Sequence, residues 1–211
     1  MAVLGWEGQG QVCSLNLNES ITPGSVKEPW ARLGRMALGT DYAQQDCSLA
    51  RALEVVGERW SMLIVRDAFY GVHRFNDFLA HLDIPRAVLT SRLQALVASG
   101  VLHKEPYQRS PVRYGYFLTD AGLELWEPIY GLAQWGERNA STGGPRTLFG
   151  HTACGTRLDR TGHCPSCDRP VPPADITMRP GPGTDERLRR DPISLALARP
   201  HRLLTPVSSD G

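Results

Sequence analysis

The amino-acid sequence predicts a mainly α-helical fold with one small β-hairpin, followed by a short cysteine- and histidine-rich module and a proline-rich tail. Residues 46–140 carry apolar side chains at helical spacing, interrupted once by a stretch with the period of strands. Three of the five cysteines lie in a short segment after this region. Eight of the 16 prolines lie at or after Pro170, so we expect a largely disordered tail over residues 172–211.

The composition is that of an ordinary folded protein, with 41% hydrophobic and 21% charged residues among 211. Residues 1–45 are rich in Gly, Ser, Asn and Gln without sustained periodicity, so we expect a flexible N-terminal arm. This region lacks the apolar run of a signal peptide, and no window of the chain approaches the roughly 18 apolar residues of a membrane span. We therefore expect a soluble, cytoplasmic protein whose cysteines serve metal binding or redox chemistry rather than disulfides.

Three short helices are predicted in the first half of the folded region. The first begins with Asp46 as its N-cap, carries apolar residues on one side and ends at Gly57. Residues 60–70 are apolar nearly all round, which predicts a helix at the centre of the core. Residues 75–82 repeat the i, i+3, i+4, i+7 spacing of an amphipathic helix.

The second half of this region predicts a further helix, a hairpin and a final long helix. A tight turn at residues 83–85 leads into a helix over about 85–99. Residues 101–118 then read as two strands joined by a polar, proline-containing tip. Thr119 is a suitable N-cap for a last helix that runs to Asn139 with two apolar stripes. Two short helices joined by a turn and followed by a hairpin are typical of a winged helix-turn-helix, here a DNA-binding and dimerisation domain over residues 46–140.

The helix at 85–99 is the predicted recognition helix. Leu89, Leu93 and Leu96 share the core-facing side with Val97, and the opposite side holds small and neutral-polar residues that suit close approach to a major groove. The net charge is only +1, but five Lys/Arg oppose one acidic residue between positions 84 and 118. Arg92 is equally suited to pairing with an acidic side chain of the same fold. The predicted DNA-contacting residues are Arg86, Ala87, Thr90, Ser91, Arg92, Gln94, Lys104, Arg109 and Arg113.

Motifs along this region resemble those of the HxlR-type winged-helix regulators, which are relatives of the MarR type. They include Glu58-Arg-Trp-Ser-Met-Leu-Ile-Val-Arg, Arg74-Phe-Asn-Asp-Phe, Val88-Leu-Thr-Ser-Arg-Leu and Ala133-Gln-Trp-Gly, in the same order. The resemblance covers residues 46–140 and implies a transcriptional regulator, not an enzyme, that binds inverted-repeat operator DNA as a homodimer. One departure is Pro85, where these regulators often have a serine, so the serine cap and its phosphate contact would be missing.

The segment 148–171 predicts a zinc-ribbon-like module. His151-x-x-Cys154 and Cys164-x-x-Cys167 form two ligand pairs separated by nine residues, a spacing that suits a structural tetrahedral zinc ion. His163 is a second candidate for the nitrogen ligand. The alternatives are a metal-free redox pair or simple thiols, and a thiol-disulfide enzyme would lack its usual βαβ surroundings. A zinc-stabilised adaptor that binds protein remains the alternative to a DNA-binding regulator.

Two further predictions concern sensing and assembly. Cys47 lies at the start of the first helix near Arg51, where the helix dipole and the arginine favour a reactive thiolate. Some relatives of the resembled family sense oxidants with a cysteine at this place, and the alternative is a small packing residue. An oxidant or a small-molecule effector is therefore a candidate partner. The final helix would expose an apolar stripe in a monomer, so Trp126, Tyr130 and Ala133 are the predicted dimer interface.

Overall fold

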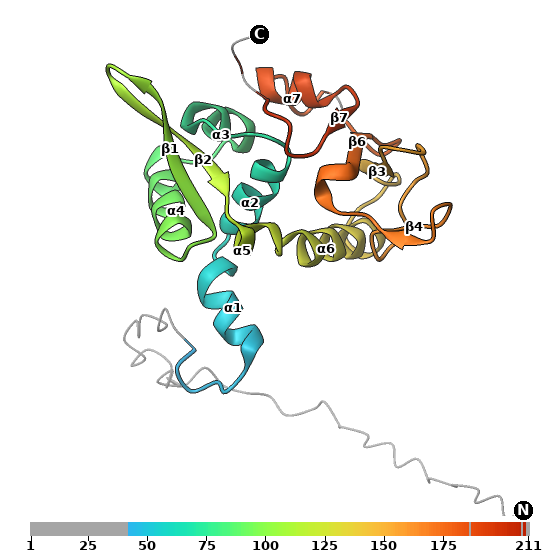
Figure 1. The fold of residues 1–211 in the computed structure, drawn as a ribbon, viewed down its shortest axis with the longest axis horizontal. Coiled ribbons are helices and arrows are strands. Elements are labelled where there is room, and N and C mark those ends of the chain that lie inside the picture. Colours follow the sequence, from blue (N-terminus) through green and yellow to red (C-terminus); the bar gives the residue numbers. More distant parts are fainter. Residues whose placement is uncertain (1–41, 186, 208, 210–211) are drawn as a thin grey trace, which may run out of the picture. The chain divides into compact units, whose positions relative to one another are not determined.

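The fold, a computed structural model, is described for residues 42–185, 187–207 and 209 (Figure 1). The elements in chain order are α1 (Ser48–Val56), α2 (Ser61–Phe69), α3 (Phe75–Leu82), α4 (Arg86–Ala98), β1 (Leu102–Arg109), β2 (Val112–Leu118), α5 (Asp120–Leu123), α6 (Trp126–Asn139), β3 (Thr147–His151), β4 (His163–Cys164), β5 (Arg169–Pro170), the 3-10 helix η2 (Pro173–Asp175), β6 (Ile176–Pro180), α7 (Pro192–Leu197) and β7 (His201–Arg202). The strands pair antiparallel as β1–β2, as β3–β6–β7 and as β4–β5. No helix in this described part is long and apolar enough to cross a membrane.

The predicted N-terminal arm over residues 1–45 lies outside the described residues except for its last four. These four are connected to α1. The backbone amide of Tyr42 donates to Glu54 Oε1 at 2.7 Å, and the guanidinium of Arg51 donates to the Tyr42 carbonyl. Cys47, rather than the predicted Asp46, is the N-cap of α1, and its side chain makes no capping hydrogen bond.

The winged-helix core forms where the apolar periodicity places it. Ile64 and Phe69 of α2, Phe78 of α3, and Leu89 and Leu93 of α4 are fully buried. Helix α2 contacts α3, α4, α6 and β2, which confirms its predicted central position. The hydrophobic helix at 61–69 can be apolar on nearly every side because neighbouring elements cover nearly every side.

The predicted long final helix is two helices. Thr119 caps the first of them, α5, and its Oγ1 accepts a hydrogen bond from the Gly122 amide at 3.1 Å. Helix α6 begins separately at Trp126, so Pro128 lies in its first turn. Amide groups of a first helical turn have no partner within the helix. A proline at this place therefore removes no hydrogen bond and does not bend the helix.

The wing is an antiparallel hairpin beside α4 (Figure 1). Its register pairs Leu102 with Leu118 at the base and Arg109 with Val112 at the tip. The register shifts next to Pro106, whose ring nitrogen cannot donate to a strand ladder.

The prediction of a largely disordered tail over 172–211 is wrong for its described residues. They form η2, β6, α7 and β7, and β6 joins β3 in a sheet. The prolines stand at the ends of elements: Pro180 ends β6, Pro192 begins α7 and Pro200 follows it. Apolar residues of this segment enter the same core as the winged helix: Ile176, Met178, Ile193, Leu197, Leu203 and Val207.

The end of the chain docks onto the end of α2. The amide of Leu204 donates to the Phe69 carbonyl at 2.8 Å, and the amide of Val207 donates to the Gly71 carbonyl at 2.9 Å. Gly71 has a φ of +85°, and a Cβ there would lie 1.7 Å from the Thr205 carbonyl oxygen. Only glycine combines this backbone conformation with so close an approach of another segment.

Candidate nucleic-acid interface and metal centre

The recognition helix α4 is held by its apolar side and offers the opposite side to solvent. Leu89, Leu93 and Leu96 are fully buried. The preceding turn is set by Asp83, which ends α3 in the left-handed conformation with a φ of +52°. Pro85 is the N-cap of α4 and provides no side-chain hydrogen bond, as its departure from the family pattern predicts.

The outward side of α4 carries the predicted base-reading residues. Ala87, Thr90, Ser91 and Gln94 are all exposed. The Thr90 hydroxyl donates to the Arg86 carbonyl at 2.9 Å, so it is satisfied within the helix. Small side chains allow the helix to approach a groove closely, and the Gln94 amide can both donate and accept at a base edge.

Two predicted arginines of α4 are engaged within the fold. Arg92 lies 3.4 Å from Glu58 Oε2 in an ion pair, so the structure favours the alternative that Arg92 pairs with an acid of the same chain. The Arg86 guanidinium lies 5.2 Å from the ring centroid of Phe75, at the start of α3. Arg86 remains exposed at the N-terminus of the helix.

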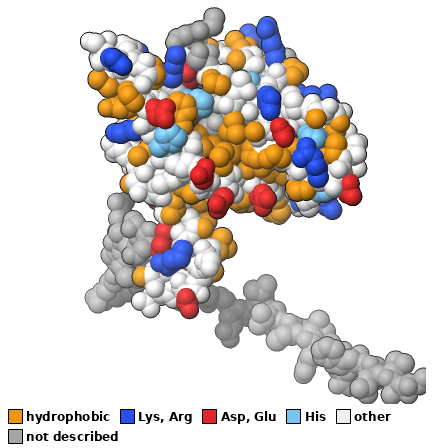
Figure 2. Space-filling model, viewed as in Figure 1, with side chains coloured by type: hydrophobic (Ala, Val, Ile, Leu, Met, Phe, Trp, Pro, Cys, Tyr) orange, Lys and Arg blue, Asp and Glu red, His pale blue; other side chains and the backbone are white. Residues whose placement is uncertain are grey.

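The hairpin carries three exposed cations, one of which lies over an aromatic ring. Lys104 Nζ lies 4.9 Å from the Tyr114 ring centroid, and Arg109 and Arg113 are exposed near the tip. Figure 2 shows basic and hydrophobic side chains together on the hairpin. Arg74, the first residue of a family motif, also meets the wing: its guanidinium lies 4.9 Å from the Tyr107 ring centroid. Its place just before the third predicted helix gives no sign of this contact.

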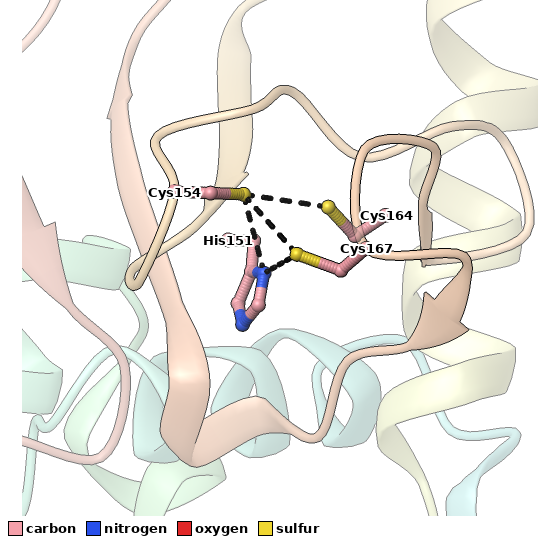
Figure 3. A group of neighbouring side chains, drawn as sticks. All are labelled: His151, Cys154, Cys164 and Cys167. Atoms are coloured by element: carbon pink, nitrogen blue, oxygen red, sulfur yellow. Dashed lines mark hydrogen bonds between the residues drawn. The ribbon is translucent and has the colours of Figure 1, made fainter.

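Four predicted ligands converge in the C-terminal region (Figure 3). His151 Nδ1 lies 3.3 Å from the sulfur of Cys154 and 3.3 Å from that of Cys167. The Cys154 sulfur lies 3.5 Å from that of Cys164 and 3.7 Å from that of Cys167. All four ligand atoms lie within 4.8 Å of one another. His163 is outside this group, so of the two candidate histidines only His151 converges with the three sulfurs.

Local backbone structure brings each ligand pair together. His151 ends β3, and the Gly155 amide donates to its carbonyl at 2.8 Å, with Gly155 at a φ of +71°. Cys164 lies in β4, and the Cys167 amide donates to its carbonyl at 3.3 Å. Each pair therefore occupies a tight turn with its two ligand atoms on the same side.

The cluster fits a tetrahedral zinc ion. Zinc–sulfur bonds of about 2.3 Å place tetrahedral sulfur ligands roughly 3.8 Å apart, close to the separations seen here. Hydrogen bonding with Thr156 lowers the pKa of the Cys154 thiol to about 6. Hydrogen bonds with Cys154 and Cys164 raise the pKa of the Cys167 thiol to about 11. A thiolate at Cys154 therefore disfavours a second one at Cys167, and a divalent cation would relieve that repulsion.

The predicted dimer residues Trp126 and Tyr130 are buried inside the chain, at 5% and 4% exposure, so they cannot form a seam between subunits. The Trp126 ring packs on Phe69 and Phe149, and Tyr130 packs edge-on against Phe149. The Tyr130 hydroxyl donates to the Asp159 carbonyl at 2.6 Å. Burial and the nearby Asp159 raise the pKa of Tyr130 to about 12, so the phenol keeps this hydrogen bond at neutral pH.

The remaining predicted residues lie at the surface. Ala133 of α6 is exposed. Cys47 is a free, exposed thiol at the N-cap of α1, so it is not the packing residue of the alternative interpretation. Its role as a redox sensor stays a prediction.

Comparison with known proteins identifies the family. A family model described as HxlR-like helix-turn-helix matches residues 55–143. The uncharacterized HTH-type transcriptional regulator Rv3095 of Mycobacterium tuberculosis (strain ATCC 25618 / H37Rv) is 42% identical over 142 residues, covering 67% of this chain and 90% of that protein. The HTH-type transcriptional regulator YdeP of Bacillus subtilis (strain 168) is 32% identical over 105 residues, covering 48% and 82%. The chain belongs to the HxlR-like helix-turn-helix family and is a transcriptional regulator rather than an enzyme.

Proposed function

We propose that this regulator binds operator DNA as a homodimer, with α4 in the major groove and the β1–β2 hairpin against the backbone. The observation that carries the proposal is the outward side of α4. It combines exposed, small and neutral-polar side chains with a firmly buried opposite side, next to a basic hairpin. A helix held rigidly in this way can enter a groove without the loss of conformational entropy that a mobile segment would undergo on binding.

The two elements would contribute differently to DNA affinity. Gln94 and Ser91 can read base edges, so they would determine sequence preference. Arg109, Arg113 and Lys104 would meet phosphate groups, which contribute affinity for any sequence and a dependence on salt.

Substitutions separate these contributions. We expect Gln94→Ala to reduce discrimination at one base position by about 1–3 kcal/mol, because a base-edge contact is lost. We expect Arg113→Ala to weaken all sequences alike and to make the slope of log affinity against log salt shallower by about one unit. Fluorescence anisotropy on fragments selected by the protein, measured at several salt concentrations, gives both quantities.

Arg160→Ala is the matched control, because Arg160 is an exposed arginine of the metal-binding region, away from α4 and the hairpin. It should leave affinity and salt slope unchanged. Equal loss of sequence preference in Gln94→Ala and Arg113→Ala would contradict the division of roles. Absence of salt-dependent binding to any fragment would favour the adaptor interpretation.

The structure supports a different dimer seam from the predicted one. Leu49 and Leu53 of α1 are 65% and 39% exposed, although they form one apolar stripe. Leu132 and Trp135 of α6 are 58% and 56% exposed. Figure 2 shows hydrophobic side chains at the surface over both helices. We propose that two copies pair through these sides of α1 and α6, which would hide apolar surface that a monomer leaves in water.

We also propose that the four-residue cluster holds a structural zinc ion. His151, Cys154, Cys164 and Cys167 would be the ligands, and the ion would cross-link β3 to the β4–β5 hairpin. The β4 and β5 strands have two residues each, so the ion would add a cross-link to a hairpin with little backbone pairing of its own. Zinc supplies a cross-link there and no catalytic step.

A further inference from the structure

A pocket lies between the winged helix and the C-terminal segment. It has a volume of about 810 Å³ and is lined by residues of α2, α3, β3, β6 and α7. Helices α3 and α7, more than a hundred residues apart in the chain, lie side by side at this place (Figure 1). Pockets of roughly 300–1,000 Å³ are typical of sites for small organic ligands.

Arginines dominate the charged lining of this pocket. Five arginines line it, against one described acidic residue, Asp185. Arg66 is held rigidly, because its guanidinium donates to Asp67 Oδ1 at 2.9 and 2.6 Å. Neither Arg146 nor Arg190 forms an ion pair with a described carboxylate. Nη1 of Arg146 donates to the carbonyl of Thr142, at 3.1 Å, and to that of Gly183, which holds the guanidinium in place without neutralising its charge. Both positive charges can therefore attract an anionic ligand.

The rest of the lining is largely apolar. Tyr70 at the C-cap of α2, Met178 of β6 and Leu197 of α7 contribute to it. Leu195 of α7 also lines the pocket and is 56% exposed, so the site presents apolar surface that nothing in the described chain covers. Apolar walls with a few convergent charged groups are the usual construction of a site for an amphipathic molecule.

We propose that this pocket binds an amphipathic organic anion, a carboxylate or sulfonate head on an aromatic or aliphatic body. The head would lie between Arg146 and Arg190, and the body would cover Leu195 and the neighbouring apolar wall. A guanidinium pairs with such a head by charge-assisted hydrogen bonds. This site goes beyond the proposed DNA binding, and its test does not depend on DNA.

The test uses the full chain and the fluorescent probe 8-anilinonaphthalene-1-sulfonate. We expect saturable binding of one probe per chain. We expect 2-naphthoate to displace it, whereas neutral 2-naphthamide and inorganic phosphate do not, because the site requires both the charge and the apolar body. Displacement by phosphate and by a random-sequence DNA duplex, but not by 2-naphthoate, would overturn the proposal and show a nucleic-acid surface instead.

Variants locate the bound probe. We expect Arg190→Ala to weaken binding about tenfold, as loss of a charge-assisted contact requires. We expect Leu195→Ala to weaken it about fourfold or more, from the apolar contact removed. Arg199→Ala is the matched control, because Arg199 is exposed just after α7 and outside the lining. Unchanged binding in both pocket variants, or an equal loss in Arg199→Ala, would overturn the proposal, with circular dichroism checking that each variant is folded.

Discussion

Replacing Cys164 with serine is expected to release the metal and unfold the C-terminal region. Cys164 is fully buried and lies in the same apolar core as the winged helix. A structural zinc ion contributes about 10–16 kcal/mol of apparent binding free energy, comparable to the entire stability of a typical domain. We expect purified protein to carry one zinc ion per chain by mass spectrometry of the metal, and Cys164→Ser to carry none.

The unfolding of this region should be visible in tryptophan fluorescence. Trp126 would lose its contact with Phe149, so its emission should shift to the red, while α2–α4 keep most of the helical signal. Cys47→Ser is the control, since Cys47 is an exposed thiol outside the cluster. Wild-type protein that is metal-free and equally stable with and without a chelator would contradict the zinc proposal.

The two tryptophans of α6 should respond differently to substitution by aspartate: one variant should lose folding stability, and the other should lose the dimer. Trp126→Asp places a charge among Phe69, Tyr130 and Phe149, so we expect a loss of more than about 4 kcal/mol in the free energy of unfolding. Trp135→Asp changes an exposed residue of the proposed seam, so we expect a folded monomer with strongly reduced operator affinity.

Urea unfolding and sedimentation velocity separate these outcomes. If the Trp126→Asp protein is folded and monomeric, Trp126 belongs to the subunit interface after all. A Trp135→Asp protein that remains dimeric at micromolar concentration would show that the seam lies elsewhere. Leu188→Asp, another exposed apolar position outside α1 and α6, is the control and should leave the dimer intact.

The helices and the hairpin of residues 46–140 could be predicted because their signals are local. Apolar spacing along α3 and α4 selects the buried side directly, and Phe78, Leu89 and Leu93 lie where that spacing puts them. The four candidate metal ligands could be predicted equally well, since two residues between the members of each pair suffice to bring them together in a tight turn.

Errors arose where a partner comes from a distant part of the chain. The apolar stripe with Trp126 and Tyr130 has no recognisable partner in the sequence, which therefore predicts that a second subunit covers it. In the structure, Phe149 of the same chain covers it. The prolines after Pro170 suggested disorder, but they stand at element ends and leave Ile176 and Ile193 free to fill the core.

The sequence by itself determined the winged-helix elements, the outward side of α4 and the four candidate ligands. Only the tertiary structure decided that Arg92 pairs with Glu58, that the C-terminal segment docks on α2, and that an arginine-lined pocket forms where they meet. The physical reason is that periodicity reports which side of an element is apolar. It does not report which of several apolar surfaces, on this chain or another, will cover that side.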